Sequence, residues 1–105
     1  MSDAQPIPTN RPAPEAVAPL LDLLAELTND SAGYLTQPDA GQQWYNRGYA
    51  NGIAAALRTL GYAEAVAATV APDPYDGHRD QAALPWGRAY EHGREKGMAE
   101  TFEVL

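Results

Sequence analysis

Two stretches of this sequence repeat one pattern of small and aromatic residues, and the pattern limits how the chain can fold. Residues 45–52 (YNRGYANG) recur 41 positions later as residues 86–93 (WGRAYEHG). The shared template is an aromatic residue, Arg two positions on, a small residue, Tyr, and a closing Gly. Five identities over about thirty aligned positions leave two origins open, a duplicated helical hairpin or convergence on one packing solution.

Small residues recur at every fourth position in both copies, which is the spacing of one helix face. They are Gly48, Gly52 and Ala56 in the first copy, and Ala89, Gly93 and Gly97 in the second. Because Gly inside a helix costs about 1 kcal/mol relative to Ala, such residues indicate close packing of one helix on another. We therefore expect helices at about 39–61 and 80–105 to cross at these faces, with Tyr49 and Tyr90 beside the contact.

Hydrophobic periodicity predicts helices elsewhere too. Val17, Leu20, Leu21, Leu24 and Leu27 share one face of a helix over 15–27. Pro19 is awkward inside this span, so either the helix starts there, with Pro19 in its first turn, or the preceding turn is loosely helical. Residues 28–40 read as a loop, Asp39 as a helix N-cap and Gly61 as a left-handed C-terminal cap. For residues 62–70 a short helix is favoured over a strand, because a lone strand would have no partner.

These patterns predict an all-α fold, a small bundle of three or four helices. Residues 1–14 hold four of the nine prolines and no periodic apolar face, so we expect a disordered proline-rich arm there. Residues 15–105 would then form a single helical domain that contains the degenerate repeat. The last helix is expected to begin between Asp80 and Pro85, after a turn-rich linker at 72–77.

Composition narrows the class of partner. The net charge of −7 opposes direct binding to a nucleic-acid backbone and suits a basic protein surface. The chain has no Cys, which excludes disulfides and thiolate metal sites. With no apolar leader after a basic start and no run long enough to span a membrane, we expect a cytoplasmic protein without membrane contact.

No catalytic constellation stands out, so we expect neither an enzyme nor a cofactor or metal site. The two histidines, His78 and His92, are 14 positions apart, and the two serines lie in loop-like contexts. The carboxylates of 73–80 lack the ligand spacing of a calcium loop. A minor alternative is an enzyme or ligand-binding module with a site between helices around Tyr49, Tyr90 and His92.

Several other side chains are candidate contacts for a protein partner. Arg47 and Arg88 occupy equivalent repeat positions and could bind a partner's carboxylates, or pair within their own fold. The full set of candidate contacts is Arg47, Arg88, Trp44, Trp86, Asp73, Asp76 and Asp80.

Two functional hypotheses follow. The first is a small acidic non-enzymatic protein-interaction module whose partner is a second copy or a host protein, with self-association as a homodimer through its small-residue helix faces. The alternative is a phage or mobile-element inhibitor that binds the basic surface of a host nucleic-acid-binding protein.

Overall fold

The computed structural model describes residues 12–105. The elements in chain order are α1 (Pro14–Asp30), η1 (Tyr34–Thr36), α2 (Gly41–Thr59), α3 (Ala63–Thr69), η2 (Pro74–Gly77) and α4 (Pro85–Val104), where η marks a 3-10 helix. Within this range there are four α-helices and no strand, so the predicted all-α class is confirmed. The predicted arm at residues 1–14 lies mostly outside the described residues, and α1 begins at its last residue, Pro14.

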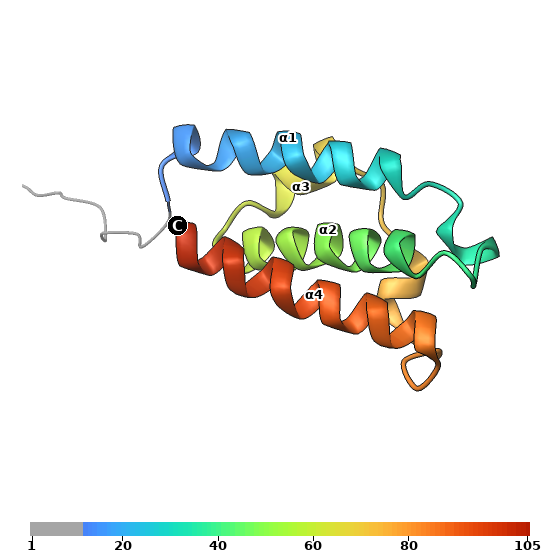
Figure 1. Ribbon diagram of the computed structural model, residues 1–105. Coiled ribbons are helices and arrows are strands. Elements are labelled where there is room, and N and C mark those ends of the chain that lie inside the picture. The colour runs from blue at the N-terminus through green and yellow to red at the C-terminus, as the bar shows by residue number, and fades with distance from the viewer. Residues whose placement is uncertain (1–11) are drawn as a thin grey trace, which may run out of the picture.

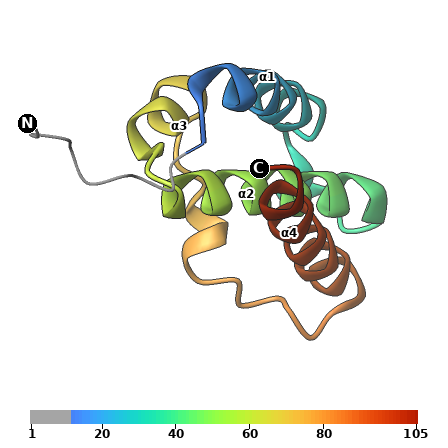
Figure 2. The same cartoon turned by 90° about the vertical axis from the view of Figure 1, so that its left-hand side faces the viewer.

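The helix α2 lies at the centre of the molecule (Figure 1). α1 runs antiparallel to α2 on one side, and α4 runs parallel to α2 on the other. The short α3 packs against α1 and α2 (Figure 2). α2 therefore contacts α1 on one side and α4 on the other.

α1 is longer than the sequence predicts, running from Pro14 to Asp30 rather than from residue 15 to 27. Proline at the first helical position lacks only an N–H that would be unpaired there. Pro19 lies inside the helix, one turn further on, and removes one backbone hydrogen bond. The C-terminal end is closed by Ser31, whose Oγ donates to the carbonyl oxygen of Leu27 at 2.7 Å.

α2 ends as its sequence predicts and begins two residues later than predicted. Gly61 adopts φ 98°, and the N–H groups of Gly61 and Tyr62 donate to the carbonyls of Arg58 and Leu57. This pair of bonds is the Schellman motif, which needs a residue that tolerates the left-handed region. At the other end the N-cap residue is Ala40 without a side-chain cap, so the predicted capping by Asp39 is wrong.

The remaining helices follow the sequence closely. Residues Ala63–Thr69 form α3, so the preference for helix over strand in 62–70 is confirmed. α4 begins at Pro85, the later of the two predicted starts, again with proline at the first helical position.

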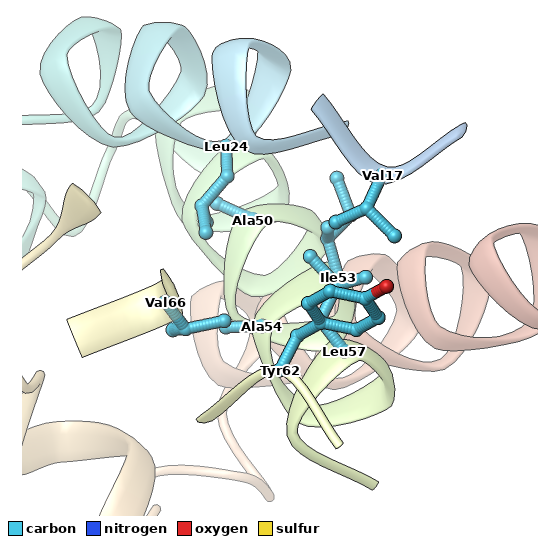
Figure 3. Close-up of a cluster of buried hydrophobic side chains, with 8 residues drawn as sticks. All are labelled: Val17, Leu24, Ala50, Ile53, Ala54, Leu57, Tyr62 and Val66. Atoms are coloured by element: carbon cyan, nitrogen blue, oxygen red, sulfur yellow. The ribbon is translucent and has the colours of Figure 1, made fainter. Parts of the chain in front are cut away.

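An aliphatic cluster fills the space between α1, α2 and α3 (Figure 3). Its residues are Val17, Leu24, Ala50, Ile53, Ala54, Leu57, Tyr62 and Val66. Val17 and Leu24 descend from α1 onto α2, and Val66 meets Ala54 from the other side. This burial is the main stabilising contribution in that half of the molecule.

A separate aromatic cluster lies where α2 and α4 begin. It consists of Tyr34, Trp44, Tyr75 and Tyr90, one residue each from η1, α2, η2 and α4. The Tyr75 and Tyr90 rings meet edge to face with centroids 4.8 Å apart, and Tyr34 meets Trp44 in the same way at 4.9 Å. The two clusters share no residue.

α2 and α4 touch through their backbones. A Cβ atom added at Gly48 would overlap the carbonyl oxygen of Tyr90, and one added at Gly93 would overlap that of Tyr45. One turn later, Gly52 faces the carbonyl of Arg94. Gly97 faces the carbonyl of Tyr49 in the same way. No side chain other than a hydrogen atom fits at these four positions.

The register of this contact differs from the register of the sequence repeat. The repeat aligns Gly52 with Gly93, whereas the packing pairs Gly48 with Gly93 and Gly52 with Gly97. The contact is therefore one helical turn out of step with the sequence alignment. An approximate two-fold relation connects the two helices, and it pairs one Gly-x-x-x-Gly stripe with the other.

Candidate functional site

The most organised polar structure in the chain surrounds η2, where two aspartates enter between α2 and α4. Asp73 caps η2, accepting a hydrogen bond from the backbone N–H of Tyr75 at 3.2 Å. Asp is a preferred N-cap and Pro74 is suited to the first helical position, so the local sequence Asp-Pro-Tyr specifies this turn. The cap holds the Asp73 carboxylate in one orientation, towards α2.

Asp73 accepts hydrogen bonds from three further side chains. Arg47 donates from Nη1 at 2.9 Å, Asn51 from Nδ2 at 3.0 Å, and the Tyr34 hydroxyl lies 3.0 and 3.1 Å from the two carboxylate oxygens. The side chains of Asp73 and Arg47 are only 8% and 13% exposed. Burial disfavours the charged carboxylate, but the donated bonds outweigh it, so the pKa of Asp73 lies below its ordinary value.

Arg47 uses the rest of its guanidinium to tie α1 to this site. Nε donates to the Ser31 hydroxyl at 2.8 Å, and Nη2 donates to the carbonyl oxygen of Thr28 at 2.9 Å. Its Cζ also lies 4.7 Å from the centre of the Tyr34 ring. The candidate partner contact Arg47 is thus occupied by its own fold, while Arg88, its repeat equivalent, is exposed.

A second ion pair joins η2 to α4. Arg94 donates from Nε to Oδ1 of Asp76 at 2.9 Å, and the Tyr90 hydroxyl donates to the same oxygen at 2.6 Å. Their side chains, at 20% exposed for Arg94 and 17% for Asp76, are largely withdrawn from water. Burial first, and then the hydrogen bond to Asp76, raise the pKa of Tyr90 above its ordinary value.

Asn51 connects the two ion pairs. Its amide nitrogen donates to Oδ2 of Asp73 and to the hydroxyl of Tyr90, the latter at 2.6 Å. We call the resulting set the polar network: Tyr34, Arg47, Asn51, Asp73, Asp76, Tyr90 and Arg94. Both carboxylates are paired with an arginine, and both tyrosines keep their protons. The network therefore holds α2, η2 and α4 together through fixed hydrogen bonds and ion pairs.

The candidate contacts Asp73 and Asp76 therefore need correction. Both were candidate contacts for a protein partner together with Asp80, but their carboxylates are bound by arginines of the same chain. Only Asp80 is open to a partner, with a side chain 68% exposed beside His78. The pairing arose between residues far apart in the sequence, which no local pattern shows.

The tryptophans belong mainly to the core. Trp44 is completely buried in the aromatic cluster, and its Nε1 donates to the carbonyl of Gln37 at 3.1 Å. Trp86 is half-buried against the same cluster, with its ring centroid 6.5 Å from that of Trp44. Of the small-residue positions, Gly48, Gly52, Gly93 and Gly97 lie in the α2–α4 contact, Ala56 is buried, and Ala89 packs on the aromatic cluster.

The minor alternative, a ligand site formed by Tyr49, Tyr90 and His92, has no geometric basis. Tyr90 is inside the aromatic cluster, Tyr49 donates to Glu100, and the His92 ring meets the Tyr45 ring edge to face at 5.6 Å. The three side chains therefore point to different neighbours.

Open hollows lie along residues 71–79. One of about 430 Å³ is lined by Arg79, Glu91, His92, Arg94, Glu95 and Met98. Two others, of about 360 and 220 Å³, both have Ala71, Pro72 and Asp73 in their lining. Among residues 12–105 no three His, Asp or Glu side chains are grouped in a way that could hold a metal ion.

α1 carries a surface feature that sequence reasoning missed. Four of its residues, Glu15, Asp22, Glu26 and Asp30, are acidic and exposed, and the helix contains no Lys or Arg. We call this set the acidic stripe. The spacing of 7, 4 and 4 residues was available in the sequence, and a helical projection of residues 14–30 would have found it.

No protein-family model matches the chain, and neither the curated proteins nor the solved structures compared with it include a match. None of the helices in residues 12–105 is long and apolar enough to cross a membrane. The fold and its polar network define a small all-α protein with a central helix clamped to a parallel neighbour.

Proposed function

We propose that this chain is a non-enzymatic protein-interaction module that binds a basic protein surface through the outward face of α1. The observation that carries the proposal is the acidic stripe. At 3.6 residues per turn its four carboxylates fall within about 80° of arc, and they extend about 22 Å along the helix axis. The buried residues of α1, Val17 and Leu24, lie on the opposite side of the helix.

The acidic stripe weakens the helix that bears it. Like charges four residues apart, as in Asp22–Glu26 and Glu26–Asp30, cost about 0.2–0.5 kcal/mol per pair. Asp30 lies in the last turn, where a negative charge opposes the helix dipole by about 0.3–1 kcal/mol. No ion pair within residues 12–105 involves any of the four. Charges that destabilise their own fold are expected where a partner uses them.

The rest of the chain leaves this negative surface uncompensated. Arg47 and Arg94 neutralise Asp73 and Asp76 inside the molecule, and Arg79 lies 3.3 Å from Glu91. Arg47 also donates to the carbonyl oxygen of Thr28 in α1, but its ion pair is with Asp73 and not with a carboxylate of the acidic stripe. The net charge of −7 is consequently borne by surface carboxylates, which would accelerate association with a basic partner at low salt.

The small-residue faces do not serve as a partner surface in this proposal. They were expected to mediate self-association, but Gly48, Gly52, Gly93 and Gly97 already lie against backbone of the same chain. A second copy could reach them only after α2 and α4 separated. The proposal therefore moves the partner contact to α1.

Charge density weighs against the narrower alternative, an inhibitor that imitates nucleic acid. The acidic stripe has four charges in about 22 Å, whereas duplex DNA has one per roughly 1.7 Å. To displace DNA from a basic groove, α1 would need help from α4 carboxylates such as Glu95 and Glu103. The inhibitor hypothesis of phage or mobile-element origin is thus a second outcome of the experiment below.

The test compares the wild-type chain with a stripe-neutralised variant, Glu15→Gln, Asp22→Asn, Glu26→Gln and Asp30→Asn. A matched control, Glu95→Gln with Glu103→Gln, removes exposed carboxylates from α4 alone. Binding of a labelled Lys-rich peptide is followed by fluorescence anisotropy at low and high salt, and tagged chains capture proteins from cell lysate in parallel.

We expect the stripe-neutralised variant to lose peptide binding and the basic proteins that the wild type retains, while the α4 control keeps them. Added DNA that competes with the captured protein would favour the inhibitor hypothesis. Equal binding by all three chains would show that α1 is not the contact face.

A further inference from the structure

The segment between α3 and α4 is fastened to the helices by a few of its own side chains. Asp73 and Asp76 reach Arg47 and Arg94, and Tyr75 places its ring in the aromatic cluster. Its first residues, Pro72 and Asp73, line two hollows of about 360 and 220 Å³. Arg79 of the same segment pairs with Glu91 of α4 at 3.3 Å. Residues 72–80 therefore lie over the helices as a strap that is held by three ion pairs and by the ring of Tyr75.

The strap belongs to one half of the molecule only. Tyr75 is one of the four rings of the aromatic cluster, and it contacts Tyr34, Trp44 and Tyr90. The aliphatic cluster contains no residue of the strap. Removing the strap would expose the aromatic cluster to water and leave the packing of α1 and α3 on α2 in place.

We propose that residues 72–80 form a strap that closes the aromatic cluster, and that the charge of Asp73 keeps it closed. When that charge is removed, the strap and the aromatic cluster open as one unit while the aliphatic cluster stays folded. Local opening of this kind is expected where few apolar contacts hold a segment in place.

The groups around Asp73 determine how it responds to acid. From α2 it faces Arg47 and Asn51, and Arg58 lies at the rim of the smaller hollow; from η1 it faces the Tyr34 hydroxyl. Protonation of Asp73 would leave Arg47 buried without a counter-charge. A buried cation in this position favours an open state in which water can reach it.

The direction of the pH effect follows from these contacts. Because its pKa is lowered in the folded chain, Asp73 contributes stability that is present above the ordinary carboxyl value of about 3.9 and is lost as the pH falls through the folded value. On the strap itself, the exposed His78 lies 3.7 Å from Asp80, and its ring meets the Tyr75 ring edge to face at 5.7 Å.

The two tryptophans make the proposal measurable. Trp44 lies in the aromatic cluster and Trp86 packs against it, whereas the aliphatic cluster has no tryptophan. In an acid titration of the wild-type chain, we expect tryptophan emission to shift to longer wavelength at a higher pH than the loss of helical circular dichroism. Coincident curves would overturn the proposal, because they would show that the molecule opens as a single unit.

A charge-removing variant tests the same proposal at neutral pH. Asp73→Asn keeps the shape of the side chain, and Asp80→Asn is the matched control on the same strap. Hydrogen exchange followed by mass spectrometry should be faster by about tenfold in residues 34–47 and 72–80 of the Asp73→Asn chain, with residues 53–66 unchanged. The Asp80→Asn chain should exchange like the wild type.

Two results for Asp73→Asn would contradict the strap. Faster exchange of equal size in both halves, including complete loss of folding, would show that Asp73 holds the whole chain together. Unchanged exchange in residues 72–80 would show that its charge does not hold the strap.

Discussion

The amide nitrogen of Asn51 lies 2.6 Å from the hydroxyl oxygen of Tyr90, and this contact joins α2 to α4 at the centre of the polar network. Each residue also donates to a different aspartate: Asn51 donates to the carboxylate of Asp73, and the Tyr90 hydroxyl donates to the carboxylate of Asp76. One amide therefore couples two ion pairs that would otherwise be independent.

Asn51→Ala should destabilise the chain by about 1–3 kcal/mol, because it removes a donor from Asp73 and leaves the Tyr90 hydroxyl with one partner fewer. Urea unfolding measures the change. Asn46→Ala is the control, since its only side-chain bond is an exposed one from Gln42, and its effect should stay below about 0.5 kcal/mol. Equal losses in the two variants would contradict the bridging role of Asn51.

Gly52→Ala should destabilise the fold although Ala is the better helix former. The new methyl would overlap backbone atoms of Arg94 and Met98, and overpacking of this kind costs roughly 1–3 kcal/mol, more than the gain of about 1 kcal/mol in helix propensity. Gly41→Ala meets no atom within 4 Å and should be neutral or slightly stabilising. Thermal melts of both variants show whether each change raises or lowers stability. A stabilised Gly52→Ala chain would disprove the close approach of α2 and α4.

Arg47→Lys and Arg88→Lys are the same change at equivalent positions of the repeat. We expect a large loss of stability at position 47 and almost none at position 88. Lysine cannot reproduce the fork by which Arg47 reaches Ser31, Thr28 and Asp73, so we expect a loss of about 2–3 kcal/mol. Arg88 is exposed, and its replacement should change stability by less than about 0.5 kcal/mol. Chemical denaturation distinguishes the two, and similar midpoints would mean that the Arg47 bonds contribute little.

Charge reversal at the two ends of α1 should have effects of opposite sign. Asp30→Arg places a cation in the last turn and removes repulsion with Glu26, so stability should rise by about 0.5–1 kcal/mol. Glu15→Arg places a cation in the first turn and should lower stability by a similar amount. Both variants should weaken binding of a Lys-rich peptide. A destabilised Asp30→Arg chain would indicate that Asp30 has an intrachain role.

Alkaline pH should unfold the chain as its buried tyrosines ionise. Burial and the hydrogen bond to Glu100 raise the pKa of Tyr49 to about 12, and burial raises the pKa of Tyr34, Tyr75 and Tyr90 as well. A raised pKa stabilises the folded state below the unfolded value of about 10, and this contribution is lost as the pH rises through the folded value.

Absorbance of the phenolate should therefore lag in the folded chain and appear together with unfolding between pH about 10 and 12. Tyr49→Phe serves as the control, since it should reduce the delayed part of the signal. Ionisation of every tyrosine near pH 10 with intact helical circular dichroism would contradict the buried hydrogen bonds.

The helices could be predicted from the sequence because their signals are local. Leucine periodicity specified α1, and Gly61 marked the end of α2, since a left-handed residue is needed there whatever the tertiary contacts. The small-residue spacing likewise indicated which faces of α2 and α4 would approach.

The polar network and the packing register could not be read in the same way. Asp73 in a Pro-Asp-Pro sequence resembles any hydrophilic turn, and its partners are at positions 34, 47 and 51. Which turn of α4 meets Gly48 depends on how the segment of residues 70–84 positions the start of that helix. Tertiary contacts determine both the polar network and the packing register. They pair Gly48 with Gly93, whereas the sequence repeat aligns Gly52 with Gly93.

The backbone contact between α2 and α4 also limits how this sequence can diverge. At Gly48, Gly52, Gly93 and Gly97 the obstacle to a larger residue is main chain, which no second substitution elsewhere can remove. Ordinary core positions can drift in compensating pairs, one side chain growing as its neighbour shrinks, but these four have no such route. In descendants that keep the fold, the two Gly-x-x-x-Gly stripes should therefore outlast every other recognisable feature, surface charges and repeat included.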